Sequence, residues 1–162
     1  MDVQRLVGLI DRYAGPLELF ARQWCENPED VVQEAFVKLA TAVLPPDRAA
    51  SWLFQVVRRG AINAGKAADR RRRHESKAFV HRTAWFEPDP TAIEPGDAVE
   101  ALQSLPVGQR EVIVARLWGG LSFEEIARLV GGSPSGAHRH YHEGLQTLRT
   151  RLGVAWNPMT NR

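Results

Sequence analysis

Histidine and arginine side chains gather at residues 138–142, just beyond a Gly-Gly-Ser-Pro joint, and they could serve several kinds of chemistry. Histidines can ligate a metal ion or transfer protons, whereas arginine and serine can bond the base edges and phosphates of DNA. On a helix that turns about 100° per residue, His138 and His142 share one face, but His140 points about 160° away from each. No cysteine or acid completes a metal-binding set at an obvious position. The pattern therefore disfavours a metal site and favours nucleic-acid contact.

The residues around this joint have the local signals of two short helices and a tight turn, in LSFEEIARLVGGSPSGAHRHYHEGL (121–145). Ser122 and Glu125 fit a capping box at the start of the first helix. Gly131-Gly132 supplies the backbone freedom for the turn, and Ser133 precedes Pro134 as the cap of the second helix. These components predict a helix-turn-helix, with an ordinary surface hairpin as the alternative. The side chains predicted to face DNA are Ser133, Ser135, His138, Arg139 and His142.

Charge is unevenly distributed along the chain, although the net charge is only +2. Residues 58–77 hold eight basic side chains against two acids, and residues 85–100 hold five acids and no base. Such a basic run can neutralise the phosphates of a nucleic acid, and the acidic stretch beside it suits a solvated connector. The asymmetry indicates a polyanion-binding face next to an acidic linker.

Hydrophobic periodicity predicts helices and almost no strands. A first helix is expected over about 3–25, bent or interrupted at Gly15-Pro16. A second should cover 28–43 with Asn27 as its N-cap and Pro28 at its first position, and a third 48–74. Further helical segments follow from about residue 97.

The fold class expected is all-α, with two small helical domains joined by a flexible linker and a helix-turn-helix in the second. The first domain is predicted to span residues 1–78. An acidic, proline-containing linker should follow over 79–96. The helix-turn-helix domain should occupy 97–153, ahead of a tail at 154–162.

Several functional classes are disfavoured by what the sequence lacks. No apolar run approaches the roughly 20 residues needed to cross a bilayer, and the start of the chain lacks a signal-peptide core, so a cytoplasmic protein without membrane insertion is expected. The single cysteine, Cys25, cannot form an internal disulfide and is interpreted as a buried thiol. Paired acids, a nucleophile elbow and a phosphate-cradling glycine loop are all missing, which disfavours an enzyme. No cofactor is expected.

Three segments together resemble the extracytoplasmic-function sigma factors of bacterial RNA polymerase. They are PEDVVQEAFVKL (28–39), SWLFQVVRRGAIN with RRRRHE (51–63 and 70–75), and LPVGQREVIVARLWGGLSFEEIARLVG (105–131). HRHYHEGLQTLR further resembles the planctomycete-type subgroup. The resemblance covers nearly the whole chain outside the linker and the last ten residues.

The resemblance implies a specificity subunit that does no covalent chemistry. Its region 2 would bind the clamp helices of the largest polymerase subunit and melt the minus-10 element, holding unstacked bases at the loop 43–50. Its region 4 would dock on the polymerase flap and read the minus-35 element. An anti-sigma factor is a further partner that the family allows.

The residues carried over form three sets. The core-polymerase set is Asp30, Gln33, Glu34 and Val37. The minus-10 DNA set is Arg58, Arg59, Asn63, Lys66, Arg70 and Arg71. The minus-35 DNA set is Ser133, Ser135, His138, Arg139 and His142.

One departure and three alternatives accompany this interpretation. The start of the recognition helix, GGSPSGAHRH, lacks the Val, Thr and Lys usual in the family, which predicts weaker or pH-sensitive binding to the upstream element. A helix-turn-helix regulator that does not act as a sigma subunit is the main alternative. A helical hydrolase using the histidines and an adaptor that binds polymerase without melting promoters are the others.

Overall fold

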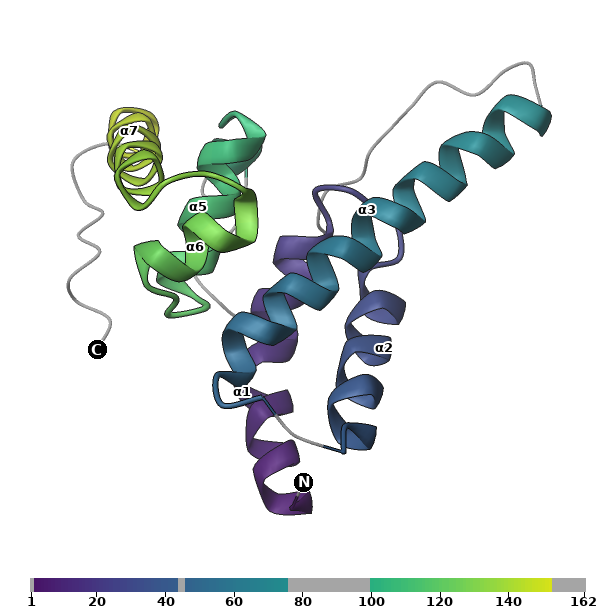
Figure 1. Cartoon of the computed structure of the whole chain (residues 1–162). Helices are drawn as coiled ribbons and strands as arrows, with labels where there is room; N and C mark the ends of the chain where they lie inside the picture. The colour runs from purple at the N-terminus through teal and green to yellow at the C-terminus, as the bar shows by residue number, and fades with distance from the viewer. Residues whose placement is uncertain (1, 44–45, 76–99, 153–162) are drawn as a thin grey trace.

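The computed structural model describes residues 2–43, 46–75 and 100–152, and within these ranges every regular element is an α-helix (Figure 1). The prediction of an all-α fold is confirmed. The helices are α1 (Val3–Ala21), α2 (Pro28–Thr41), α3 (Ala49–Glu75), α5 (Val107–Leu117), α6 (Phe123–Val130) and α7 (Pro134–Leu152), and residues 100–103 are also helical. The predicted linker 79–96, the predicted tail 154–162 and the boundaries of the two predicted domains all lie outside the described residues.

Helices α1, α2 and α3 pack on one another around a shared apolar core. Phe20 and Phe54 are both fully buried, and their rings meet edge to face at 5.0 Å between centroids. Such large side chains supply most of the burial energy of a small core. Helix α3 is 27 residues long, and its second half projects beyond this bundle as a basic arm (Figure 1).

A bend or an interruption was predicted at Gly15-Pro16, and of the two the interruption is wrong, because α1 continues through Pro16. Proline removes one backbone hydrogen bond, but Tyr13, Leu17 and Phe20 on either side of it are buried on one face. Packing along that face therefore holds the helix together across the missing bond. The helix ends at Ala21, before the predicted end at Cys25, and the Cys25 thiol is half-buried and donates to the carbonyl of Ala21 at 3.5 Å.

Two glycines on α3 allow neighbouring backbone and side chains to approach closely. A Cβ at Gly65 would lie 2.1 Å from the carbonyl oxygen of Trp24, and one at Gly60 would lie 2.9 Å from a Val31 methyl carbon. The backbone of Trp24 cannot move aside for a methyl group as a flexible side chain can. Gly65 is therefore required for packing where α3 passes the end of α1.

Helices α5, α6 and α7 form the second group. The predicted capping box, glycine turn and serine cap are all present in it. The Ser122 hydroxyl accepts from the amide of Glu125 at 3.2 Å, and the Glu125 carboxylate accepts from the amide of Ser122 at 2.8 Å. Gly131 ends α6 in the left-handed conformation with φ of 79°. The Ser133 hydroxyl then accepts from the amide of Gly136 at 3.1 Å and caps α7. The predicted helix-turn-helix is thus α6, its glycine turn and α7.

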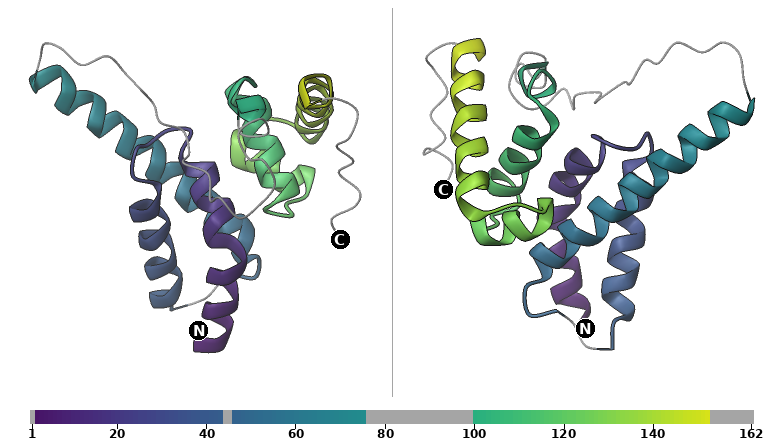
Figure 2. Two further views of the ribbon diagram at one scale, coloured as in Figure 1. Left: turned by 180° about the vertical axis from the view of Figure 1, so that it is seen from behind. Right: turned by 45° about the horizontal axis from the view of Figure 1, so that its top comes forward.

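The two groups of helices are packed against each other rather than held apart. Helices α5 and α6 lie between α7 and the first bundle, with α5 on α1 and α6 on α3 (Figure 2). One apolar cluster runs across the contact. It includes Leu53, Phe54 and Val57 from α3, with Val112, Val114, Ala115, Leu121, Ile126 and Leu129 from the second group.

Gly65→Ala is expected to lower the free energy of unfolding by about 1–3 kcal/mol, because its methyl group would collide with the backbone of Trp24. Gly8→Ala is the matched control, since an added Cβ there meets nothing within 4 Å and alanine favours the helix by about 0.5–1 kcal/mol. Urea unfolding followed by circular dichroism measures both. Equal stability of the two variants would contradict the close contact at Gly65.

Candidate polymerase and nucleic-acid interfaces

The outer face of α2 is polar and carries one exposed valine. Asp30, Gln33 and Glu34 are exposed, and the Val37 side chain is 60% exposed among them. The opposite face is buried through Val31, Val32, Ala35, Phe36 and Leu39. All four residues predicted to bind core polymerase therefore share one accessible face, where Val37 offers an apolar contact point beside two acids, one of which, Glu34, pairs with Lys38 at 2.7 Å.

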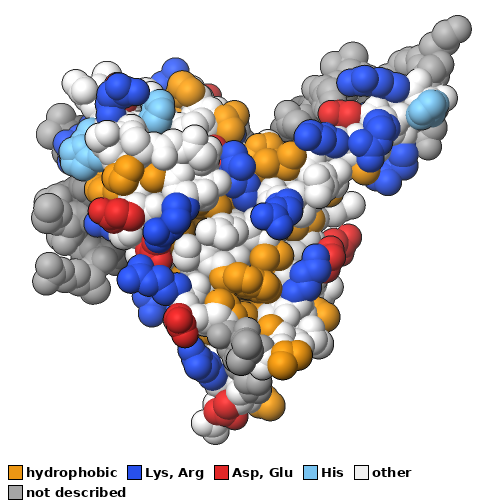
Figure 3. All heavy atoms as spheres, in the orientation of Figure 1, with side chains coloured by type: hydrophobic (Ala, Val, Ile, Leu, Met, Phe, Trp, Pro, Cys, Tyr) orange, Lys and Arg blue, Asp and Glu red, His pale blue; other side chains and the backbone are white. Residues whose placement is uncertain are grey.

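The projecting half of α3 presents most of the predicted minus-10 residues to solvent. Basic side chains gather over its free end (Figure 3). The exposed members of the predicted set are Arg59, Asn63, Lys66, Arg70 and Arg71. Arg72, which was not in the set, bonds Glu26 at 3.1 Å and so anchors the arm to the turn after α1. Cations spaced along one rigid helix can contact successive phosphates.

Arg58 is the one residue of the predicted minus-10 set that is only partly exposed to solvent. Its Nε donates to the Glu111 carboxylate of α5 at 2.6 Å, and its guanidinium lies 5.5 Å from the centre of the Trp24 ring. The two side chains of the pair are 28% and 6% exposed. Burial raises the pKa of Glu111, and the bond from Arg58 opposes that shift. Arg58 is thus engaged within the protein.

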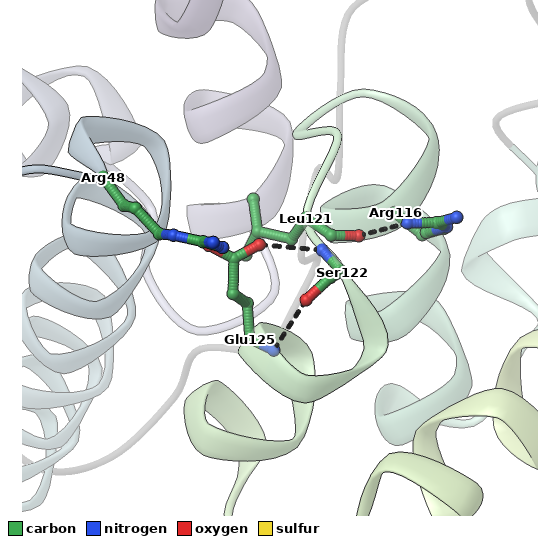
Figure 4. A network of polar contacts seen from close by, with 5 residues as sticks. All are labelled: Arg48, Arg116, Leu121, Ser122 and Glu125. Atoms are coloured by element: carbon green, nitrogen blue, oxygen red, sulfur yellow. Dashed lines mark hydrogen bonds and ion pairs between the residues drawn. The ribbon is translucent and has the colours of Figure 1, made fainter.

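Arg48, directly before α3, makes a second bond to the other group of helices (Figure 4). Its guanidinium donates to Glu125 Oε1 at 2.9 Å, while Oε2 of the same carboxylate accepts from the Ser122 amide. Burial disfavours the charged carboxylate, but the bonds from Arg48 and Ser122 outweigh it and lower the pKa of Glu125. Close by, Arg116 donates to the carbonyl of Leu121 at 2.7 Å and steadies the turn before α6. One carboxylate therefore both caps α6 and binds the predicted base-holding loop.

Helix α7 presents its predicted DNA-facing residues to solvent. Its apolar side is buried through Ala137, Leu145 and Leu148. The exposed set is Ser133, Ser135, His138, Arg139 and His142. The Ser133 hydroxyl is already used in the cap, so its role at the helix start is structural as well.

The two histidines predicted to share a face of α7 do so, with their Nε2 atoms 3.0 Å apart. His138 also packs edge to face on Phe123 of α6, at 5.1 Å between ring centroids. His140 is less exposed and lies 3.9 Å from the Glu143 carboxylate. Among the residues with described coordinates, no group of three His, Cys, Asp or Glu side chains is arranged to hold a metal ion.

A cavity of about 260 Å³ opens between α3 and α6. Its lining is Gln55, Arg58, Arg59, Ile62, Asn63, Arg128 and Leu129. Arg128 was not predicted to be near the minus-10 residues, Glu111 was expected at no site, and Arg48 was covered only as a member of the base-holding loop 43–50. Glu111 carried a usable signal, because it lies on the same helical face as Val114 and Ala115, which are apolar and buried. Arg128 carried none.

The fold and its exposed faces define an all-helical DNA-binding protein with a helix-turn-helix. The chain matches the family models for sigma-70 region 2 over residues 9–74 and for sigma-70 region 4 over residues 96–148. It is 31% identical to the RNA polymerase sigma factor CarQ of Myxococcus xanthus over 90% of this chain and 87% of that protein. It is also 32% identical to the ECF RNA polymerase sigma factor SigD of Mycobacterium tuberculosis over 80% of this chain, but it spans only 65% of that relative.

A solved structure, the sigma factor RpoE in complex with the anti-sigma factor NepR from Bartonella quintana, has the same fold. It aligns with a TM-score of 0.70 over 94% of this chain and 97% of that one, at 19% identity. The chain belongs to the sigma-70 family, and it is an RNA polymerase sigma factor of the extracytoplasmic-function type. Its partners are core RNA polymerase and promoter DNA. The resemblance to the planctomycete-type subgroup stays a prediction.

Proposed function

We propose that this sigma factor divides promoter recognition among three of its helices. The outer face of α2 binds the clamp helices of the largest polymerase subunit, the basic side of α3 with the loop 43–50 melts the minus-10 element, and α7 reads the minus-35 element while its domain docks on the flap. In this proposal residues 1–78 and 97–153 are the two functional domains and 79–96 the linker. The observation that carries it is the exposed face formed by Asp30, Gln33, Glu34 and Val37, on a helix whose opposite face is buried in the core.

The geometry of α7 supports its assignment to the major groove. Its N-terminal turn is held by the Ser133 cap and the buried Ala137, so the helix start is rigid. The Arg139 side chain is 70% exposed and can extend to a guanine edge, where bidentate bonds discriminate between bases. His138 and His142 offer one hydrogen-bonding surface beside it.

The remaining parts of the proposal concern setting and regulation. We infer that the protein acts in the cytoplasm, where its polymerase is found, and that it performs no covalent chemistry of its own. The described part of the chain holds no helix suited to crossing a bilayer, which is in keeping with that setting. An anti-sigma protein is a candidate third partner, supported by the one bound to the solved sigma factor of the same fold.

The central test is transcription by purified core polymerase on genomic fragments, with and without this chain. We expect transcripts that begin at defined positions only when the chain is present. A helix-turn-helix regulator would bind DNA but would not direct initiation by the core enzyme. Absence of discrete starts, with the protein folded and bound to DNA, would therefore favour that alternative.

Arg139→Ala is expected to weaken binding of the holoenzyme to its upstream element by about 5- to 150-fold, since one bidentate base contact contributes about 1–3 kcal/mol of discrimination. Ser135→Ala should weaken it less, because a hydroxyl makes a single neutral bond. Neither change should affect binding to core polymerase. Arg149→Ala, at an exposed position in the last turn of α7, is the control. Electrophoretic mobility shifts on a selected promoter measure these effects, and unchanged affinity in both test variants would refute the assignment of α7.

Asp30→Lys with Glu34→Lys is expected to abolish co-purification with core polymerase, because like charges would then face the basic side of the clamp helices. The matched control is Asp11→Lys with Glu100→Lys, which makes the same change in net charge at exposed positions outside α2. Retention of core binding by the α2 variant would show that this face is not the docking surface.

A further inference from the structure

His138 and His142 lie about one helical turn apart on α7, and their ring nitrogens meet in solvent. The two Nε2 atoms are 3.0 Å apart, and the ring centroids are 4.2 Å apart with 52° between the ring planes. Both side chains are exposed. Neutral imidazole is the commonest metal ligand in proteins. Two such nitrogens that converge on one point are therefore a chelating arrangement as well as a hydrogen-bonded one.

The separation of the two nitrogens matches what a single metal ion requires. Imidazole nitrogen binds late first-row divalent ions at about 2.0–2.1 Å. Two nitrogens at a right angle around the ion then lie about 3.0 Å apart, whereas a tetrahedral angle places them about 3.3–3.4 Å apart. The observed 3.0 Å fits cis positions on a square-planar or octahedral ion, such as Ni²⁺ or Cu²⁺. Tetrahedral Zn²⁺ would require the two rings to move apart slightly.

Aromatic neighbours hold both rings in this orientation. Phe123 of α6 packs edge to face on His138 at 5.1 Å between centroids, and Tyr141 packs edge to face on His142 at 5.5 Å. The Arg116 guanidinium lies 4.9 Å from the centre of the Phe123 ring and covers it in turn. Ligand side chains that are already ordered lose less conformational entropy when they bind. The pair is thus arranged before an ion arrives.

The pair can hold an ion without a third side chain. His140 lies beside Glu143, and within the described ranges no third His, Cys, Asp or Glu joins the pair. The lack of a third ligand is what disfavoured a metal site in the sequence, yet water can fill the open positions of an ion held by few side chains. Arg139 is the neighbouring cation, and the Glu143 carboxylate 3.8 Å away offsets its charge.

We propose that His138 and His142 chelate one late first-row divalent cation through their Nε2 atoms, and that this ion strengthens the contact of α7 with the upstream element. The hydrogen on one Nε2 moves through solvent to the Nδ1 of the same ring, so that both Nε2 lone pairs reach the ion. The hydrogen bond lost in this step is exposed and neutral, and such bonds contribute little. The effect on DNA rests on the proposed function, because it requires α7 to lie in the major groove.

A bound ion changes what α7 offers to DNA. Its positive charge lies beside Arg139, where it attracts phosphates and steepens the dependence of binding on salt. Its water ligands donate charge-assisted hydrogen bonds, and the N7 of purines and the O6 of guanine are acceptors in the major groove. Upstream elements with purines opposite the pair should therefore respond most to the ion.

Isothermal titration calorimetry of the full chain with Ni²⁺ tests the site in the absence of DNA. The wild type should bind its tightest ion about tenfold or more strongly than His138→Ala does, because loss of one nitrogen removes the chelate. His142→Gln keeps a hydrogen-bonding side chain beside His138 and should lose the ion equally. His140→Ala, which removes a histidine outside the pair, is the matched control and should bind Ni²⁺ as the wild type does.

Mobility shifts of the holoenzyme on a selected promoter, with and without Ni²⁺, measure the effect on DNA. The ion should strengthen binding of the wild type and of His140→Ala about fivefold, because charge-assisted bonds are stronger than neutral ones, and should leave binding of His142→Gln unchanged. Equal affinity for Ni²⁺ in the wild type and His138→Ala, or promoter binding that ignores the ion, would overturn the proposal. Calorimetry involves no polymerase, so failure there leaves transcription from defined starts intact. A chain that binds the ion but directs no defined starts would instead refute the proposed function.

Discussion

The contact of Arg58 with Glu111 ties together the two halves of this molecule. Helix α3 supplies core residues to the first bundle, carries the basic arm, and receives α5 and α6 on the surface between them. Arg58 is held between the Trp24 ring and the Glu111 carboxylate. A shift of the second group of helices along α3 would therefore leave the buried Glu111 carboxylate without its partner, which is costly. Apolar packing favours the contact, and the ion pair determines its position. The same helix thus sets both the stability of the first bundle and the placement of the helix-turn-helix.

The surfaces proposed to meet the polymerase and the upstream element differ from those at this contact. The outer face of α2 and the exposed face of α7 are both uncovered, and each is backed by a fully packed apolar side. Rigid backing reduces the conformational entropy lost on binding, since the contacting side chains already sit on ordered helices. Only the surface proposed to melt the promoter is partly covered by other residues of the same protein.

The elements that depend on near neighbours in the chain could be predicted, and those that depend on distant ones could not. Ser122, Glu125, Gly131 and Ser133 lie within a few residues of their partners, and their cap and turn roles followed from spacing alone. The amphipathic faces of α2 and α7 were predictable for the same reason. Pro16 was misjudged because packing at Tyr13, Leu17 and Phe20 outweighs one missing hydrogen bond. The pairing of Arg58 with Glu111 was beyond reach, since no local sequence pattern relates two residues that are 53 apart.

The histidine pair on α7 has a consequence for how bases are read. Two Nε2 atoms 3.0 Å apart hold a single hydrogen between them while both rings are neutral, so one ring is the Nε2–H tautomer and the other the Nδ1–H tautomer. The pair then offers outward one acceptor and one donor, and these change places only when both rings change tautomer together, with the Nδ1 hydrogen also moving through solvent. Such a surface can match either partner of a base-edge pattern without moving the helix.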